Sequence, residues 1–319
     1  MAGKRTGWLA ALGVAAAGGA ALTAAAKKLF RTTVEADASW QYGGKDKDSH
    51  PYSRYGERPK QDREWFLSEE MEDVRITSSI DDTGLHARYY PCEDPKRFIL
   101  CAHGYRSTPE YHFAGVARWL HEIGCTLLFI DERGCGQSEG RYITFGAREK
   151  YDVMDWFDWL DARNPEQRPM YLYGVSMGAT AVMCASEYVL PASFAGLIAD
   201  CGFTSMKDIL AACMKSWYNI NLRSLLWTVD QFCREEAHFS MAEADAEKAL
   251  RKCNRPALII HGTEDHFVPP SHAVRNYHAC AAPKKDILWV DGAGHAASWY
   301  QDTEKYQEAV LDLFGVCEQ

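Results

Sequence analysis

The sequence predicts an α/β protein with a mostly parallel sheet that is covered by helices on both faces. Two observations lead to this fold class. From residue 74 onward, short apolar runs alternate with longer stretches whose apolar residues recur at helical spacing. The short runs are apolar almost throughout, as strands buried on both sides require. Strands that alternate with helices indicate βαβ units, which build a parallel sheet between two helical layers.

The elements are expected in the following order along the chain. Two strands, Val74–Ile80 and Leu85–Tyr90, are joined by a turn at residues 81–84. Further expected strands are Phe98–Ala102, Thr126–Ile130, Met170–Tyr173, Gly196–Ala199, Ala257–Ile260 and Ile287–Val290. The expected helices around them, from their apolar periodicity, are Pro109–Ile123, Glu149–Leu160, Met177–Leu190, 271–280 and 299–314.

Composition and charge exclude several classes of protein. The 319 residues are 47% apolar, 25% charged and 12% aromatic, which excludes a disordered, collagen-like or multi-pass membrane chain. The formal net charge is −9, from 35 Lys+Arg against 44 Asp+Glu, and it argues against a nucleic-acid partner because phosphate binding needs a basic face. The 11 cysteines are an odd number without Cys-x-x-Cys spacing, so we expect buried free thiols rather than a disulfide framework or a zinc site.

The first residues form a separate region. An uncharged stretch at residues 6–26 lies between Lys4-Arg5 and Lys27-Lys28 and consists mostly of alanine and glycine. As a helix it would just span a hydrocarbon core of ~30 Å. We therefore favour a single membrane anchor in residues 1–31, whose sidedness the flanking charges do not determine. A cleaved signal peptide, which would make the protein secreted, and an amphipathic or disordered tail remain open.

The rest of the chain divides into a tether and one main domain. Residues 32–70 are polar and are expected to form a tether with a lead-in helix near Glu64–Met71. The main domain covers residues 71–319 and contains a helical cap at residues 206–253. The aromatic residues of this cap either line an acyl pocket or pack the cap onto the sheet; they are Trp217, Tyr218, Trp227, Phe232 and Phe239.

A serine lies where chemistry is expected in such a sheet, after the carboxyl end of a strand. The run Gly174-Val-Ser-Met-Gly178 is a G-x-S-x-G between the strand at Met170–Tyr173 and the next helix. Here Ser176 can occupy a sharp turn at positive φ with its hydroxyl exposed above the sheet, because the flanking glycines have no Cβ to crowd the turn. A serine that only caps the helix would have the same neighbours. A serine hydroxyl is a poor nucleophile on its own, so a catalytic role also requires a base.

Two later strand ends supply a candidate base and a candidate acid. His295 follows the last expected strand in the loop Asp291-Gly-Ala-Gly-His295, and Asp265 follows the strand before it. A carboxylate that accepts a hydrogen bond from the imidazole fixes its tautomer and stabilises the imidazolium form. The order Ser176, Asp265, His295 is the one that a catalytic triad takes on an α/β sheet.

Two other aspartates end expected strands. Asp200 is an alternative acid, although we favour a role as a hydrogen-bond acceptor that orients its loop. Asp131 is expected to order the loop at Arg133-Gly134. The chain has no P-loop and no H-E-x-x-H motif, so no metal and no organic cofactor are expected.

These motifs resemble those of the α/β-hydrolase superfamily, and the similarity runs from about Val74 to Phe314. Within it, three segments resemble the bacterial serine-hydrolase group related to serine aminopeptidases and prolyl-oligopeptidase catalytic domains; they are Asp131–Ser138, Gly174–Gly178 and His261–Pro269. The resemblance implies an eight-stranded sheet with one reversed strand, a lid inserted after strand six and an oxyanion hole.

The resemblance also implies roles for individual residues. It makes Ser176 the nucleophile, Asp265 the acid and His295 the base. His103-Gly104-Tyr105-Arg106 corresponds to the oxyanion loop after strand three. The backbone N–H groups of Tyr105 and Met177 are therefore expected to bind a tetrahedral oxyanion.

The expected activity is cleavage of carboxylic ester-type bonds through an acyl-enzyme, with a small-molecule ester, thioester or peptide as the substrate. Peptidase, amidase, thioesterase and acyltransferase activities need the same three groups, so these alternatives stay open. A ligand-binding protein on a hydrolase scaffold is the alternative from another class.

Overall fold

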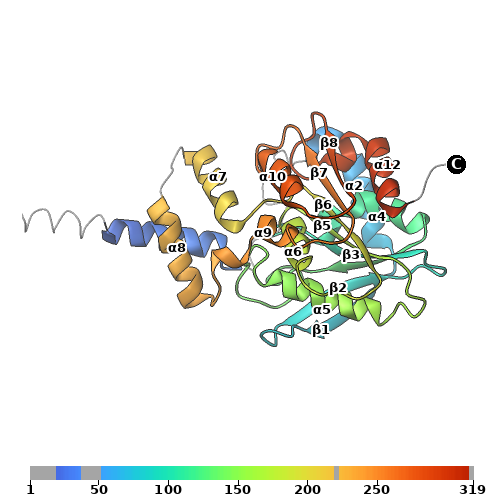
Figure 1. The fold of residues 1–319 in the computed structure, drawn as a ribbon, viewed down its shortest axis with the longest axis horizontal. Helices are drawn as coiled ribbons and strands as arrows, with labels where there is room; N and C mark the ends of the chain where they lie inside the picture. The colour runs from blue at the N-terminus through green and yellow to red at the C-terminus, as the bar shows by residue number, and fades with distance from the viewer. Residues whose placement is uncertain (1–18, 37–51, 219–222, 316–319) are drawn as a thin grey trace, which may run out of the picture.

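The computed structural model describes residues 19–36, 52–218 and 223–315 (Figure 1). Its centre is an eight-stranded sheet in the order β1-β2-β4-β3-β5-β6-β7-β8, in which only β2 runs antiparallel to its neighbours. The strands are β1 (Glu72–Thr77), β2 (Gly84–Tyr90), β3 (Arg97–Ala102), β4 (Cys125–Ile130), β5 (Met170–Val175), β6 (Phe194–Asp200), β7 (Ala257–Gly262) and β8 (Lys285–Val290). The predicted fold class, including the single reversed strand, is confirmed.

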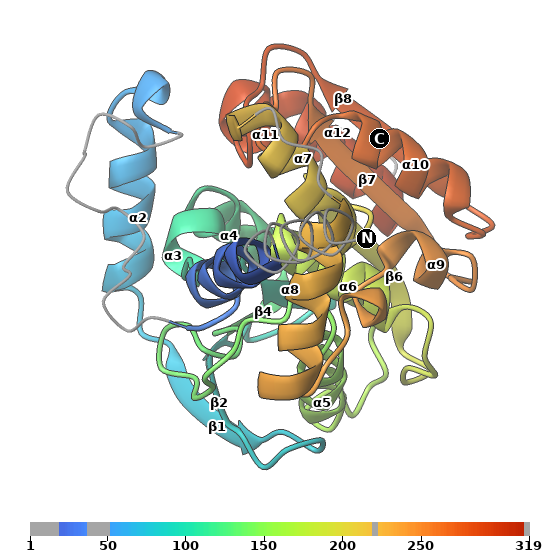
Figure 2. The same cartoon turned by 90° about the vertical axis from the view of Figure 1, so that its left-hand side faces the viewer.

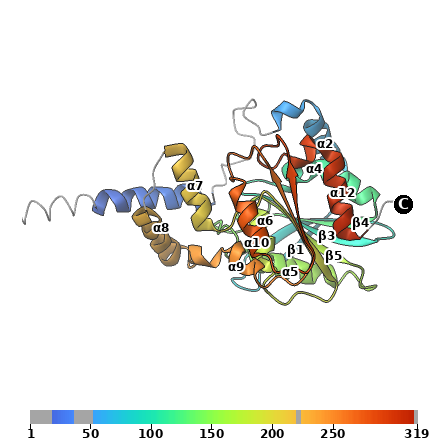
Figure 3. The ribbon, with the colours of Figure 1, turned by 45° about the horizontal axis from the view of Figure 1, so that its top comes forward.

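Helices cover both faces of this sheet, as Figure 3 shows. One face carries α5 (Glu149–Asp161), α6 (Met177–Ala185), α9 (Ala246–Leu250) and α10 (Ser271–Ala279). The other face carries α2 (Arg58–Ser68), α3 (Pro109–His112), α4 (Ala114–Glu122), α11 (Ser298–Gln301) and α12 (Thr303–Phe314). Strands β4, β5 and β7 are buried along their whole length, which explains their continuous apolar runs.

Three helices differ from the sequence prediction in their bounds. The helix predicted at residues 109–123 is divided at Phe113, and the one predicted at residues 299–314 is divided at Asp302. Asp302 caps α12, because its side chain accepts a hydrogen bond from the Lys305 N–H. Helix α6 ends at Ala185, before the predicted Leu190. Apolar periodicity missed these breaks because the short pieces keep their buried sides in register.

The first two helices of the cap extend away from the sheet beside an N-terminal helix, whereas its last helix, α9, packs on the sheet face. The cap consists of α7 (Met206–Tyr218), α8 (Arg223–Glu236), the 3-10 turn η3 (Met241–Glu243) and α9. With the helix at residues 19–33, it builds a third apolar cluster that also contains Met177 (Figure 1). Among the cap aromatics Phe239 is buried, Phe232 is partly buried in this cluster, and Trp227 is 66% exposed. The side chains of Trp217 and Tyr218 lie outside the described residues.

The predicted N-terminal regions are only partly described. Residues 1–18 lie outside the described part of the chain, and with them most of the predicted anchor. Within the described residues, no helix has the length and apolar character that a membrane crossing needs. The helix at residues 19–33 runs through the predicted boundary at residue 31, and the predicted lead-in helix is α2, which begins at Arg58.

Two glycines allow the close approach of α6 to the sheet. An added Cβ at Gly178 would lie 2.1 Å from the carbonyl oxygen of Ala102 at the end of β3. An added Cβ at Gly174 would lie 2.3 Å from the carbonyl oxygen of Gly178. Both contacts are with backbone, which cannot move aside, so only glycine fits at either position.

We expect Gly178→Ala to destabilise the fold by about 3 kcal/mol, because the methyl group forces the start of α6 away from β3. Urea unfolding followed by circular dichroism measures the change. Gly294→Ala is the matched control, since an added Cβ there meets nothing within 4 Å; it should change stability by less than about 0.5 kcal/mol. Equal stability of the two variants would contradict the close approach.

Candidate active site

Ser176 lies in the tight turn between β5 and α6. Its backbone has φ 57° and ψ −114°, the left-handed region that was predicted for the G-x-S-x-G turn. The Ser176 N–H donates to the carbonyl oxygen of Asp200 at 2.8 Å, which ties the turn to the end of β6. Ser176 is buried, with only 4% of its surface exposed. A strained conformation of this kind persists only where the surrounding structure enforces it.

The structure brings the three predicted triad residues together from three strand ends. His295 Nε2 lies 2.9 Å from Ser176 Oγ, and His295 Nδ1 lies 2.7 Å from Asp265 Oδ2. Both distances are those of direct hydrogen bonds. The ring of Phe267 packs edge-on against His295 with centroids 4.9 Å apart. One imidazole therefore connects the serine hydroxyl to the carboxylate.

Asp265 is held as a buried carboxylate. Its Oδ1 accepts hydrogen bonds from the backbone N–H groups of Phe267 at 2.9 Å and Val268 at 2.8 Å. Burial alone would raise the pKa of Asp265, but the charge of His295 and the hydrogen bonds from His261 and His295 outweigh burial and hold this pKa well below its usual range. The acid is therefore ionised at neutral pH.

The loop after β3 lies directly against Ser176. An added Cβ at Gly104 would come within 3.1 Å of Ser176 Cβ. The Gly104 N–H donates to His112 Nδ1 at 2.9 Å. Neither the Tyr105 N–H nor the Met177 N–H has a hydrogen-bond partner among the described residues. Both N–H groups that were predicted to bind an oxyanion are thus unpaired within the described part of the chain.

Comparison with known proteins finds relatives and structural neighbours of this chain. The serine aminopeptidase family S33 matches residues 93–235. The uncharacterized protein YqkD of Bacillus subtilis is 27% identical over 238 residues, which are 73% of this chain and 75% of that protein. The esterase Pf2001 of Pyrococcus furiosus superposes with a TM-score of 0.62 at 22% identity, over 79% of this chain and 92% of that one. Acetyl xylan esterase 1 of Thermoanaerobacterium superposes with a TM-score of 0.54 at 15% identity, over 83% and 94%.

The chain has the α/β-hydrolase fold. The eight strands, the single reversed strand and the cap after β6 are those that the sequence resemblance implied. The fold places Ser176 after β5, Asp265 after β7 and His295 after β8, so the three residues are far apart in sequence and adjacent only through the sheet.

The other two aspartates that follow strands make hydrogen bonds outside the triad. Asp200 accepts hydrogen bonds from Tyr306 Oη at 3.0 Å and Ser298 Oγ at 3.4 Å. Asp131 accepts from His86 Nδ1 and from the Gln137 N–H, both at 2.8 Å. Neither carboxylate is bonded to His295, so each has the role of a hydrogen-bond acceptor that orients its surroundings.

One group of potential metal ligands coincides with the triad. Cys201 Sγ, an Asp265 carboxylate oxygen and a His295 ring nitrogen lie within 4.8 Å of one another. Burial raises the pKa of the Cys201 thiol well above its usual value, so metal binding would first require an unfavourable deprotonation. A metal ion here would also take His295 from Asp265. These residues therefore fit proton transfer better than metal binding.

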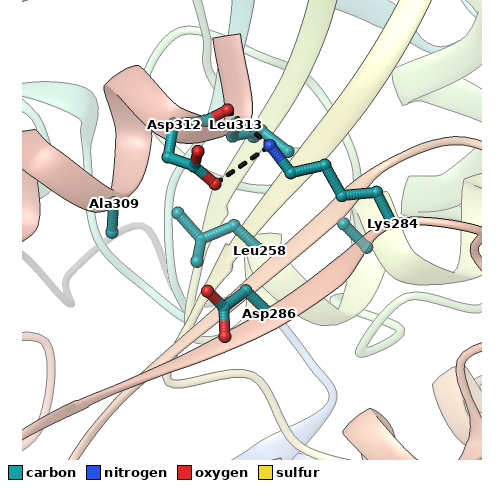
Figure 4. Close-up of a pocket in the computed structure, with 7 residues that line it drawn as sticks. Leu258, Lys284, Asp286, Ala309, Asp312 and Leu313 are labelled. Atoms are coloured by element: carbon teal, nitrogen blue, oxygen red, sulfur yellow. Dashed lines mark hydrogen bonds and ion pairs between the residues drawn. The ribbon is translucent and has the colours of Figure 1, made fainter. Parts of the chain in front are cut away.

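Two hollows of the described surface lie near the amino ends of β6 and β7, at the edge of the sheet opposite the triad. Figure 4 shows the smaller one, where the Lys284 ammonium group contacts Asp312 at 2.9 Å beside the start of β7. Its volume of about 10 Å³ admits one water at most. The larger hollow, of about 300 Å³, lies near Ser186 and Phe194 at the end of α6. Neither hollow is lined by the triad.

Sequence reasoning missed the neighbours that the N-terminal residues provide. Tyr105 Oη donates to the carbonyl oxygen of Thr33 at 2.8 Å, and Arg106 Nη2 donates to that of Glu35 at 2.7 Å. Backbone carbonyls leave no side-chain signal in a sequence. Ala26, Phe30 and Val34 do recur every four residues, and this spacing could have indicated a buried helix face.

We expect the stability of the protein to fall as pH rises from 3.8 to about 6, because of Asp200. Burial raises the pKa of Asp200 from 3.8 to about 6, although the Tyr306 hydrogen bond and the charges of His261 and His295 oppose it. A folded-state pKa above the unfolded one stabilises the protein below pH 3.8, and this contribution is lost as pH rises through 6. The loss amounts to about 3 kcal/mol.

Asp200→Asn should remove this dependence, so the stability difference between variant and wild type should shift in favour of the variant between pH 4.5 and 7.5. Urea unfolding at both pH values measures it. Asp286→Asn, at an exposed aspartate of β8, is the matched control for loss of one charge. A constant difference across this pH range would contradict the raised pKa.

Proposed function

We propose that the protein is a serine hydrolase that cleaves carboxylic ester-type bonds through an acyl-enzyme intermediate. The observation that carries this proposal is the continuous hydrogen-bonded path from Ser176 Oγ through His295 to Asp265, at 2.9 and 2.7 Å. Structural similarity to two esterases adds support at the level of the fold. A non-catalytic scaffold has no need of a strained serine, a paired imidazole and a buried carboxylate in one line.

In the first half-reaction Ser176 Oγ attacks the substrate carbonyl carbon while His295 Nε2 takes the hydroxyl proton. Asp265 accepts from Nδ1–H, so the imidazole keeps Nε2 free as an acceptor and its positive charge is stabilised once the proton arrives. The carbonyl oxygen becomes an oxyanion that the N–H groups of Tyr105 and Met177 bind. Each such donor lowers the barrier by roughly 3 kcal/mol.

The first tetrahedral intermediate then collapses to the acyl-enzyme, which water hydrolyses. The bond from carbon to the leaving oxygen breaks, and His295 Nε2 returns its proton to the departing alkoxide, which leaves as an alcohol. Water next attacks the acyl carbon and gives a proton to His295. The second tetrahedral intermediate expels Ser176 Oγ, which recovers its proton, and a carboxylic acid is released.

The surroundings of Met177 favour an apolar acyl group. Met177 follows the proposed nucleophile and belongs to the cluster shared by the cap and the N-terminal helix. Val268, Met206 and Phe203 are buried in the same cluster. Because an acyl chain bound beside Met177 would meet this cluster, activity should rise with acyl-chain length from acetate upward until the chain fills the space.

The serine aminopeptidase match keeps amides as the second candidate substrate class. Ester and amide cleavage use the same three groups, and they differ in the leaving group that His295 must protonate. A panel of p-nitrophenyl esters with graded acyl chains, assayed beside aminoacyl anilides, separates the two. Turnover of anilides but not of esters would make a peptidase the better assignment.

We expect a fluorophosphonate probe to label the wild-type protein and to leave Ser176→Ala unlabelled, because the probe phosphonylates an activated serine. Ester turnover of Ser176→Ala should fall by about 10⁶-fold, to background. Ser68→Ala, at an exposed serine of α2, is the control and should label fully. In-gel fluorescence measures the labelling. Equal labelling of wild type and Ser176→Ala would end the proposal.

Asp265→Asn should lower kcat by about 10⁴-fold while the protein stays folded. The asparagine Oδ1 can still accept from the N–H groups of Phe267 and Val268, which turns the amide NH₂ toward His295 Nδ1. The imidazole then carries its proton on Nε2 and cannot accept from Ser176. Asp291→Asn, at an exposed aspartate of the loop that precedes His295, should retain activity. Steady-state kinetics with the best ester decide the outcome.

A further inference from the structure

The N-terminal segment, residues 19–36, lies against the oxyanion loop rather than apart from the hydrolase body. Its helix runs over residues 19–33, and Figure 2 shows it, in dark blue, side by side with α8. After the helix, Glu35 pairs with Tyr142 in an antiparallel bridge. The segment therefore connects the cap to the loops at the carboxyl edge of the sheet.

Carbonyl groups at the end of the N-terminal helix and just after it accept hydrogen bonds from the oxyanion loop. The last carbonyls of a helix have no partner within the helix and need donors from elsewhere. The hydroxyl of Tyr105 supplies one at 2.8 Å to Thr33 O, and the guanidinium of Arg106 supplies another at 2.7 Å to Glu35 O. Arg106 has a φ of 49°, so the loop holds a left-handed residue at this point.

Apolar contacts hold the segment in place from the other side. Ala26, Phe30 and Val34 are fully buried, and the Phe30 ring lies 6.0 Å from that of Phe232 in α8. The Ile143 N–H donates to Val34 O at 2.8 Å. Undocking the segment would expose this apolar face and break these hydrogen bonds together, so the docked position is the stable one.

The body of the protein holds the first half of the oxyanion loop and also reaches its second half, where the Arg106 backbone N–H faces the Cys135 thiol. His103 Nδ1–H donates to Gly104 O at 2.8 Å, and His112 Nδ1 accepts from the Gly104 N–H. The N-terminal segment adds hydrogen bonds to the Tyr105 hydroxyl and the Arg106 guanidinium, while the Tyr105 ring stacks on Phe145 of the body at 5.0 Å. The N–H proposed to bind the oxyanion lies between the two halves.

We propose that the N-terminal segment is a positioning element of the active site, which holds the Tyr105 N–H in place through Thr33 O and Glu35 O. This inference rests on the proposed function, because it assigns the segment to the same oxyanion hole. An oxyanion donor acts only within about 2.7–3.1 Å of the developing charge. A shift of the loop by a fraction of this distance weakens catalysis without disturbing the triad.

The test uses two substitutions in the full chain. Tyr105→Phe removes the hydroxyl that binds Thr33 O and keeps the ring on Phe145, so kcat should fall about tenfold. Phe30→Asp places a charge in the interface with α8 and should undock the segment, with a fall in kcat of about 100-fold. Trypsin cleavage at Lys27 and Lys28 should accelerate in the second variant and report the undocking.

The readouts separate positioning from a general loss of structure. A trifluoromethyl ketone forms a tetrahedral adduct whose oxyanion occupies the hole, so its affinity should fall by the same factor as kcat. KM for the ester and the pH profile should stay as in wild type, because substrate contacts and His295 are unchanged. Tyr188→Phe, which removes a hydroxyl bonded to Tyr151 far from the site, and Ala24→Asp, on the exposed side of the N-terminal helix, are the matched controls.

Each outcome decides the proposal. Parallel losses in kcat and ketone affinity, with normal controls, support it. Wild-type kcat and ketone affinity in Tyr105→Phe would overturn it, even if Phe30→Asp failed to fold. A wild-type protein that neither labels with fluorophosphonate nor hydrolyses any ester would overturn the proposed function, and this inference with it. An active, labelled wild type with unaffected variants would overturn the inference alone.

Discussion

The site depends on one steric constraint, the close approach of the α6 N-terminus to the ends of β3 and β5. Gly174 and Gly178 make this approach possible, because a Cβ at either position would collide with backbone. The approach forces Ser176 to a φ of 57° and lifts its side chain out of the strand direction toward His295. It also leaves the first N–H of the helix without an internal partner. A nucleophile and a hydrogen-bond donor are thus obtained from the same turn.

The parallel sheet converts this local turn into a site. Strands β5, β7 and β8 end at the same edge, so the loops that follow them bring a serine, an aspartate and a histidine together without any nearness in sequence. Burial then sets the chemistry. Asp265 is enclosed yet ionised, because backbone N–H groups and imidazole surround it, whereas the enclosed Asp200 has only hydroxyl donors and its pKa rises to about 6. Two carboxylates at adjacent strand ends therefore behave differently.

The cap and the N-terminal helix pack together beside the proposed acyl-binding residues and the oxyanion loop. Their shared apolar cluster reaches from α8 to Met177, so the residues that would receive an acyl chain also hold the N-terminal segment in place. Through Thr33 O and Glu35 O, the same segment bonds to the oxyanion loop. The proposed acyl-binding residues and the oxyanion loop therefore contact the same N-terminal segment. The triad residues, by contrast, are held by loops that follow strands of the sheet.

The sequence by itself determined the alternation of strands and helices, the turn at Ser176 and the candidates Asp265 and His295, because periodicity and glycine placement are local signals. It did not reveal the helix breaks at Phe113 and Asp302, since both pieces of each helix keep the same buried side. Only the tertiary structure decided that Asp265 rather than Asp200 meets His295, because both follow strands and direction is set by the loops. Only the tertiary structure showed residues 19–36 docked on the oxyanion loop. Backbone carbonyls make those contacts, and every sequence carries the same carbonyls.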